Sequence, residues 1–189
     1  ASAPCQYAIS NNCGTVQFIG NTSIKAYKNQ TAFDSCKFGS YEIPTVKINT
    51  TGTITGDIEL SGGKLEISAG TFEGNIRTVS GYAKGDAIIT GGTFSSDVSD
   101  YLAKGFSLIA NSDGTFGVDR LNESNAAAVV NGTYYGTLAE AVGAAQDGQT
   151  VTVLKDLATA PVTTSAGITL DLDGHTLRIV SDTSGVAYG

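Results

Sequence analysis

The sequence has few charged residues and contains neither methionine nor tryptophan. Asp, Glu, Lys and Arg make up 15% of its 189 residues, whereas an average soluble protein has roughly 25%. The surface must therefore take its polarity from Ser, Thr, Asn and Gly. The net charge is -7 and the Lys and Arg residues are scattered. The chain thus lacks the basic cluster with which a protein binds nucleic acid or an anionic membrane.

Long hydrophobic runs are also absent. No apolar stretch approaches the roughly 18 residues of a membrane-spanning helix, so we expect no membrane insertion. Hydrophobic residues still amount to 41% of the chain, which is enough for a core. Because the sequence begins with Ala-Ser-Ala-Pro rather than Met, we expect a processed or excised piece, and a cleaved signal peptide would leave such a start.

Cysteine and histidine are few. The three cysteines, Cys5, Cys13 and Cys36, lie near the start of the chain, far in sequence from the one histidine, His175. Their spacing fits no zinc pattern, and we predict neither a metal site nor a cofactor. In an exported protein we expect one disulfide and one free thiol, with a pairing that the sequence does not determine. The alternative is three buried reduced thiols.

A repeat is the most informative feature that is present. The tripeptide Gly-Thr-Phe occurs at 70–72, 92–94 and 114–116, so its three copies are equally spaced. A fixed interval of roughly 20–50 residues is typical of solenoid proteins, and this one is at the short end of that range. Around the first two copies, Ile, Val and Phe alternate with polar residues as in half-buried strands. Glycine pairs at 62–63 and 91–92 predict tight turns between the strands.

These features predict an all-β fold, a parallel β-helix (solenoid) built from stacked coils. Coils stack at about 4.8 Å, so side chains at equivalent positions form ladders. We expect Phe72 to lie over Phe94 and Ile67 over Ile89. The third Gly-Thr-Phe follows Asn-Ser-Asp between two apolar runs, and this context favours a hairpin over a further coil.

A short helix is predicted for 95–105, with Asp97 and Asp100 in its first turn and a glycine at its end. The character of the sequence then changes near residue 125. Val-Asn-Gly-Thr at 130–133 predicts a type I′ hairpin. A capping box of Thr137 and Glu140 predicts one short capping α-helix near 138–146. Strands are expected at 150–154, 160–164 and 168–180.

The chain is accordingly divided into three parts. Residues 1–50 are a Cys-containing segment of unknown type, 51–120 the end of a β-helix unit with a closing helix and hairpin, and 125–189 the cap and first coils of a second unit. Segments within residues 60–180, "ITGGTFSSDVSDYLAKGF" and "GTYYGTLAEAVGAAQDGQTVTVLKDL" among them, resemble pectate-lyase-like right-handed β-helix repeats of large surface proteins of gut-dwelling Firmicutes. The resemblance is specific for architecture rather than for activity.

Polysaccharide lyases and galacturonan hydrolases also have parallel β-helix folds, so a catalytic site is the alternative interpretation. Glycoside hydrolysis requires two carboxylates about 5–10 Å apart. Asp171 and Asp173 are expected on one strand face, about 7 Å apart, near His175 and Arg178. All four come from one corner of the chain, where residues 173–175 also fit a simple turn.

A lyase would require an acidic cluster beside a basic residue. The three arginines, Arg77, Arg120 and Arg178, are far apart in the sequence, and no acidic ladder is predicted beside any of them. We therefore predict no catalytic residues and no enzymatic activity.

Exposed tyrosines remain as candidates for ligand contact. Beside a groove, Tyr41, Tyr82 and Tyr101 could stack on sugar rings, whereas packing at the cap explains Tyr134 and Tyr135 better. We expect an extracellular structural or adhesive segment of a repeat-built bacterial surface protein, with a glycan or another host surface ligand as its partner. The alternatives are a carbohydrate-active enzyme or its remnant, and a fibre subunit that self-associates through open β-helix ends.

Overall fold

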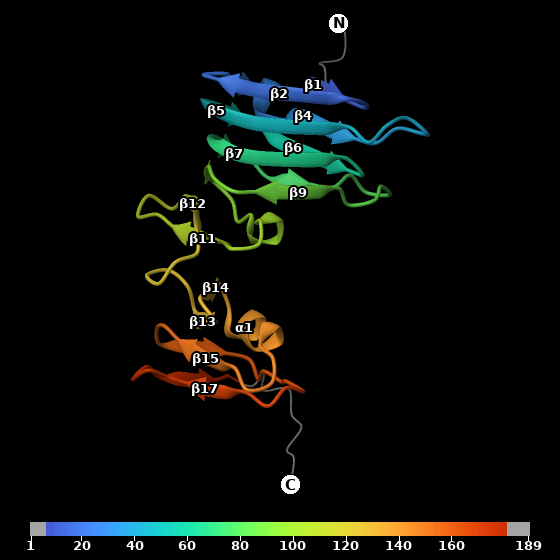
Figure 1. The fold of residues 1–189 in the computed structure, drawn as a ribbon. Coiled ribbons are helices and arrows are strands. Elements are labelled where there is room, and N and C mark those ends of the chain that lie inside the picture. Colours follow the sequence, from blue (N-terminus) through green and yellow to red (C-terminus); the bar gives the residue numbers. More distant parts are fainter. Residues whose placement is uncertain (1–6, 181–189) are drawn as a thin grey trace, which may run out of the picture. The chain divides into compact units, whose positions relative to one another are not determined.

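The computed structural model of the chain describes residues 7–180, apart from the side chain of Asn29. Strands account for 49% and helix for 7%, and the strands form a parallel β-solenoid of about eight turns with one short α-helix. The predicted fold class, an all-β parallel solenoid with a single short helix, is therefore confirmed. The chain divides into two compact units, residues 1–119 and 120–189 (Figure 1).

The first unit consists of short strands and two single-turn 3-10 helices. Its described strands are β1 (Tyr7–Asn11), β2 (Thr15–Gly20), β3 (Ile24–Lys25), β4 (Thr31–Cys36), β5 (Thr45–Thr55), β6 (Asp57–Ser61), β7 (Lys64–Glu73), β8 (Ile76–Arg77), β9 (Asp86–Ile89), β10 (Thr93–Phe94), β11 (Phe106–Ala110) and β12 (Phe116–Arg120). The 3-10 helices are η1 (Tyr27–Asn29) and η2 (Ser99–Tyr101).

These strands form two sheets. One has the strand order β1-β4-β6-β8 and is called here the β4–β6 sheet. The other, the β5–β7 sheet, has the order β11-β12-β10-β7-β5-β2, with β3 paired to β5 and β9 to β7. Successive coils pair in parallel, as β4 does with β6 and β5 with β7.

One hydrophobic core lies between the two sheets of the first unit. Strands β4 and β6 contribute Phe33 and Leu60, and strands β5 and β7 contribute Ile48 and Ile67, none of them more than 1% exposed. Alternate residues of a strand point to opposite faces of its sheet. The apolar residues of each strand therefore enter the core while the polar ones between them face outward.

The predicted side-chain ladders are confirmed. Phe72 pairs with Phe94 in register, and their rings stack with centroids 4.7 Å apart and planes 9° apart. Ile67 pairs with Ile89 in the same way. Phe116, from the third Gly-Thr-Phe, also pairs with Phe94, but in the antiparallel direction. The third copy therefore belongs to a hairpin, as its context predicts.

The interval between stacked residues varies along the first unit. Val16 pairs with Val46, Val46 pairs with Leu65, and Leu65 pairs with Ala87. The first of these three intervals is the longest and the second is the shortest. Loops at the corners of the coils absorb the differences. Because β1 and β2 pair in parallel with β4 and β5, residues 7–50 form the first coils of the same solenoid.

The helix predicted for 95–105 is wrong in extent, because only the single turn η2 is helical. The chain returns to the solenoid at Leu102, which forms a parallel bridge with Ile89, and this leaves room for one turn. Asp100 lies in that turn, whereas Asp97 precedes its N-cap residue, Val98, and the Oδ1 of Asp97 accepts the backbone N–H of Ser99 at 2.8 Å. This hydrogen bond lowers the pKa of Asp97.

The second unit contains the short helix and the remaining strands. Its described elements are β13 (Ala128–Val130), β14 (Thr133–Tyr135), α1 (Leu138–Ala144), β15 (Thr150–Val153), β16 (Leu157–Thr159), β17 (Thr169–Asp171) and β18 (Leu177–Ile179). One sheet has the order β14-β13-β15-β17, and β16 pairs with β18 in a second.

The start of the second unit follows the sequence prediction closely. Strands β13 and β14 form a hairpin whose turn residues, Asn131 and Gly132, have φ of 50° and 78°. Thr137 Oγ1 accepts the backbone N–H of Glu140 at 3.2 Å, and Glu140 Oε2 accepts that of Thr137 at 3.1 Å, which completes the capping box. Helix α1 begins there and packs its buried residues against the unit's core.

Two strand predictions for the second unit are wrong. The single strand expected at 168–180 is divided into β17 and β18, which belong to different sheets. The strand expected at 160–164 is absent from the described residues, and β16 at Leu157–Thr159 takes its place beside β18. Pro161 lies within the expected segment and has no N–H to donate to a sheet ladder. The prediction therefore put the strand on the wrong side of the proline.

Candidate functional site

The acidic corner considered in the sequence is a turn on the surface of the second unit. Asp171 Oδ1 accepts the backbone N–H of Asp173 at 3.0 Å, and Asp173 has a φ of 45°. His175 Nδ1 lies 3.8 Å from Asp156 Oδ1, and Arg178 is exposed. The hydrogen bonds of these residues stabilise the turn itself, as expected if the corner is structural.

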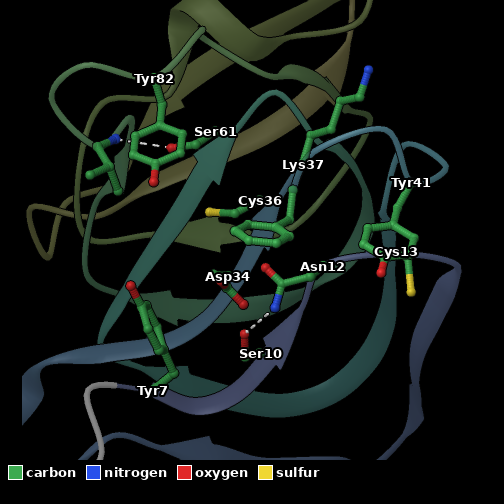
Figure 2. A pocket seen from close by; sticks show the side chains of 12 residues that line it. Tyr7, Ser10, Asn12, Cys13, Asp34, Cys36, Lys37, Tyr41, Ser61 and Tyr82 are labelled. Carbon is green, nitrogen blue, oxygen red and sulfur yellow. Dashed lines mark hydrogen bonds between the residues drawn. The ribbon is translucent and has the colours of Figure 1, made fainter.

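The largest concentration of exposed aromatic residues lies elsewhere, beside the β4–β6 sheet of the first unit (Figure 2). There a pocket of about 480 Å³, called here the tyrosine pocket, opens to solvent. It is lined by Tyr7, Ser10, Asn12, Cys13, Asp34, Cys36, Lys37, Phe38, Tyr41, Ser61, Val79 and Tyr82. These residues come from segments far apart in the sequence, which the stacking of the coils brings together.

Tyrosines surround the pocket and polar groups lie between them. Figure 2 shows Tyr7, Tyr41 and Tyr82 around Asp34 and Asn12. Tyr41 and Tyr82 are 63% and 57% exposed, and Phe38, which also lines the pocket, is 63% exposed. Of the tyrosines considered as ligand contacts in the sequence, Tyr41 and Tyr82 thus lie in one pocket.

Tyr101 and Tyr135 have structural surroundings instead. Tyr101 packs against the core of the first unit, and the ammonium group of Lys84 lies 4.7 Å from its ring centroid. Tyr135 packs against the core of the second unit. The interpretation of Tyr135 as a packing residue is confirmed.

The polar groups in the pocket wall are held by short hydrogen bonds. Asp34 is only 4% exposed, and its Oδ1 accepts the backbone N–H of Asn11 at 2.7 Å. Asn12 Nδ2 donates to Ser10 Oγ at 3.0 Å, and Ser61 Oγ accepts the backbone N–H of Val79 at 3.0 Å. Figure 2 shows the last two of these bonds as dashed lines. These hydrogen bonds fix the positions of the polar groups in the pocket wall.

A ladder of polar side chains, three of them charged groups of Asp, Glu and Arg, adjoins the pocket on the outer face of the β4–β6 sheet. Ser10, Asp34, Glu59 and Arg77 are paired in register across β1, β4, β6 and β8. Glu59 is 4% exposed, and its Oε1 forms an ion pair with Arg77 Nη2. Arg77 Nε also lies 3.1 Å from Asp57 Oδ2.

The prediction that no acidic ladder accompanies an arginine is therefore wrong for Arg77. The carboxylates of Asp57 and Glu59 reach it from β6, which lies one coil earlier. Asp34 belongs to the coil before that. Only the register of the coils shows that these residues are neighbours, and coil lengths in this part of the chain do not follow the constant interval of the Gly-Thr-Phe copies.

The ladder changes the titration of two groups in the tyrosine pocket. Hydrogen bonding with Glu59, then burial, then the charges of Glu59 and Asp34 raise the pKa of Tyr7 to about 12. Burial, followed by the charge of Asp34, raises the pKa of the Cys36 thiol. Glu59 Oε2 is buried and accepts no well-aligned hydrogen bond within the described residues. Tyr7 therefore lies near the Glu59 carboxylate without an aligned hydrogen bond to its Oε2.

No disulfide is found in the part of the chain that the structure describes. Cys13 is exposed and Cys36 is half-buried, and both are free thiols. Cys5 lies outside the described residues. A disulfide between Cys13 and Cys36, one of the expected pairings, is thus not formed.

The two free thiols are expected to react at different rates. In a Cys5→Ser background at pH 8, Cys13 should be alkylated by iodoacetamide faster than Cys36, because the raised pKa of Cys36 leaves less of the reactive thiolate. Asp34→Asn removes one cause of that raised pKa, and the pH profile of Cys36 alkylation should move to lower pH. Peptide mass spectrometry measures both rates. Equal rates for the two thiols, or a profile that Asp34→Asn leaves in place, would contradict these assignments.

Comparisons with protein-family models, with curated proteins and with solved structures find no match to this chain. None of the described helices is long and apolar enough to cross a membrane. Within residues 7–180, no three His, Cys, Asp or Glu side chains are grouped so that they could hold a metal ion.

Proposed function

We propose that this chain is an extracellular, non-catalytic binding segment of a repeat-built bacterial surface protein, and that it holds a saccharide in the tyrosine pocket. The observation that carries this proposal is the grouping of Tyr7, Phe38, Tyr41 and Tyr82 around a polar wall. The resemblance to pectate-lyase-like repeats of surface proteins in gut Firmicutes supports the setting.

Saccharides present two kinds of surface, and the tyrosine pocket offers a partner for each. The C–H faces of sugar rings are apolar and stack on aromatic rings, which Tyr41 and Tyr82 expose. Sugar hydroxyls require hydrogen-bonding groups, which Ser10, Asn12 and Asp34 provide. A volume of about 480 Å³ falls within the range of roughly 300–1,000 Å³ that is typical of small-molecule sites.

The stacked coils suit a structural role in the same protein. Each coil adds about 4.8 Å along the solenoid axis, and each contacts only its neighbours, so such a fold can be extended by repetition. The tyrosine pocket lies beside the β4–β6 sheet and opens to solvent, so a glycan chain longer than the pocket can extend beyond it.

The proposal predicts that single tyrosines control saccharide affinity. On an array that includes pectin, alginate and host glycans, Tyr41→Ala and Tyr82→Ala should each weaken binding about twofold to tenfold, since an aromatic contact contributes roughly 0.5–1.5 kcal/mol. Isothermal titration calorimetry with the best ligand gives the numbers.

Tyr27→Ala is the matched control, because Tyr27 is 59% exposed and is not among the lining residues. It should bind like the unchanged protein. An equal loss in Tyr27→Ala, or unchanged binding in both pocket variants, would show that the tyrosine pocket is not the binding site.

Cleavage of a glycosidic bond is a second candidate function, favoured by one observation. Asp34 and Glu59 occupy adjacent rungs of parallel strands, which lie about 4.8 Å apart, and retaining glycosidases hold their two carboxyl groups about 5–5.5 Å apart. Binding ranks first because Glu59 is engaged by Arg77 and Thr31. Release of reducing ends from the bound glycan, lost in Glu59→Gln, would reverse this order.

A further inference from the structure

The charges around the tyrosine pocket are unequally accessible to a ligand. Among the residues that line the pocket, Asp34 is acidic and Lys37 is basic. Figure 2 shows the Lys37 side chain directed away from Asp34, whereas the Asp34 carboxylate lies between Tyr7 and Asn12. A ligand that enters among the tyrosines therefore meets a carboxylate.

A second carboxylate lies directly behind the first. Glu59 is the register neighbour of Asp34 on the next strand, and both residues are only 4% exposed. Two carboxylates on adjacent rungs, about 4.8 Å apart, repel each other, and this repulsion is weakly screened by solvent where the groups are buried.

The described cations do not offset this negative charge fully. Arg77 is shared between Asp57 and Glu59, and it also donates to Thr31 Oγ1 at 3.1 Å. One guanidinium group is therefore shared by the carboxylates of Asp57 and Glu59, and Asp34 lies one rung beyond Glu59. The second oxygen of Glu59, Oε2, is buried without a well-aligned donor. The strands that carry Asp34 and its register neighbours thus hold three carboxylates, those of Asp34, Asp57 and Glu59, and one guanidinium group, that of Arg77.

We infer that the tyrosine pocket selects a saccharide with a free, positively charged amino group, and that the Asp34 carboxylate binds that group. The inference rests on the proposed function and adds the chemical class of the ligand. An ammonium group offers positive charge and hydrogen-bond donors to the Asp34 carboxylate. It can also approach the face of a tyrosine ring favourably. A uronic acid would instead bring a third carboxylate towards Asp34 and Glu59.

Three hexasaccharides of matched length test this inference by calorimetry: one of glucosamine, one of N-acetylglucosamine and one of galacturonic acid. At a pH low enough to protonate the sugar amine, we expect the glucosamine hexamer to bind about tenfold to hundredfold more tightly than the acetylated one. This is the range for hydrogen bonds to a charged group. The galacturonate hexamer should bind most weakly.

Two variants assign the selectivity to one side chain. Asp34→Asn keeps an oxygen that can accept the Asn11 N–H and should bring the glucosamine and N-acetylglucosamine hexamers to similar affinities. Lys37→Ala should keep the difference between them. Circular dichroism confirms that Asp34→Asn is folded, and its binding of the acetylated hexamer serves as a second check.

The possible failures are distinguishable. Similar affinities of the unchanged protein for the three hexamers, or a preference for galacturonate, would overturn the amino-sugar inference while saccharide binding stands. A preference for glucosamine that Asp34→Asn leaves unchanged would overturn the role of Asp34. Absence of binding by all three hexamers and by the glycan array would remove the proposed function and this inference with it.

Discussion

Replacing Phe94 with alanine is expected to lower the free energy of unfolding of the first unit by about 3–5 kcal/mol, the usual cost of deleting a buried Phe side chain. Phe94 is 1% exposed and stacks on Phe72 with a centroid distance of 4.7 Å. Its removal leaves a cavity between two rungs that are joined by backbone hydrogen bonds, so the neighbours cannot close it. Urea denaturation followed by circular dichroism measures the effect.

Phe38→Ala provides the comparison for this large loss. Phe38 is 63% exposed, and substitutions at such surface positions usually change stability by at most about 0.5 kcal/mol. If Phe94→Ala were no more destabilising than Phe38→Ala, the stacked rungs would not be the source of the unit's stability.

Gly63→Ala is expected to have an effect of similar size through backbone contact. A Cβ atom at Gly63 would lie 2.2 Å from the carbonyl oxygen of Ser35 in the preceding coil, well inside van der Waals contact. The carbonyl belongs to the backbone and cannot rotate away as a side chain could. We expect a loss of roughly 3 kcal/mol or more, at the upper end of overpacking costs, measured by the same denaturation.

Gly117→Ala is the control that separates the effect of a clash with the neighbouring coil's backbone from the general effect of replacing a glycine. The nearest atoms to its Cβ would be those of the Asn111 side chain, at 3.8 Å, and the carbonyl oxygen of Ile109, at 4.0 Å, which are ordinary contacts. In strand β12 the alanine should be neutral or slightly stabilising. Equal losses at Gly63 and Gly117 would mean that the coils are not packed backbone to backbone as described.

The glycine pairs show how far a sequence pattern can be interpreted. Both pairs were expected to be turns with positive φ. In each pair, one member fulfils this, Gly62 with a φ of 68° and Gly92 with 112°. The other member, Gly63 or Gly91, is needed because the backbone of the preceding coil lies too close for a side chain. Alternating apolar and polar residues thus predict strands, and glycine pairs predict corners. Which backbone atoms of two coils come into contact depends on the register between the coils, which these patterns do not give.

Register also explains why the sequence pattern does not predict most of the candidate site. Phe72 and Phe94 were found because their coils have equal length, so that identical tripeptides mark equivalent positions. Asp34 and Glu59 lie in coils separated by longer and irregular loops, and no repeated motif aligns them. Tyr41 and Tyr82 were recognised as exposed aromatics, but their meeting in one pocket depends on the same unaligned coils.

The most direct test of the account is to map where a saccharide binds. Amide chemical shifts of nitrogen-15-labelled protein are recorded during titration with the best ligand of the glycan array. The account predicts the largest shifts at Asn12, at residues 34–38 and at Tyr41 and Tyr82. Shifts concentrated instead on the outer face of the β5–β7 sheet, where Lys47 and Glu66 form an ion pair at 2.9 Å, would contradict it.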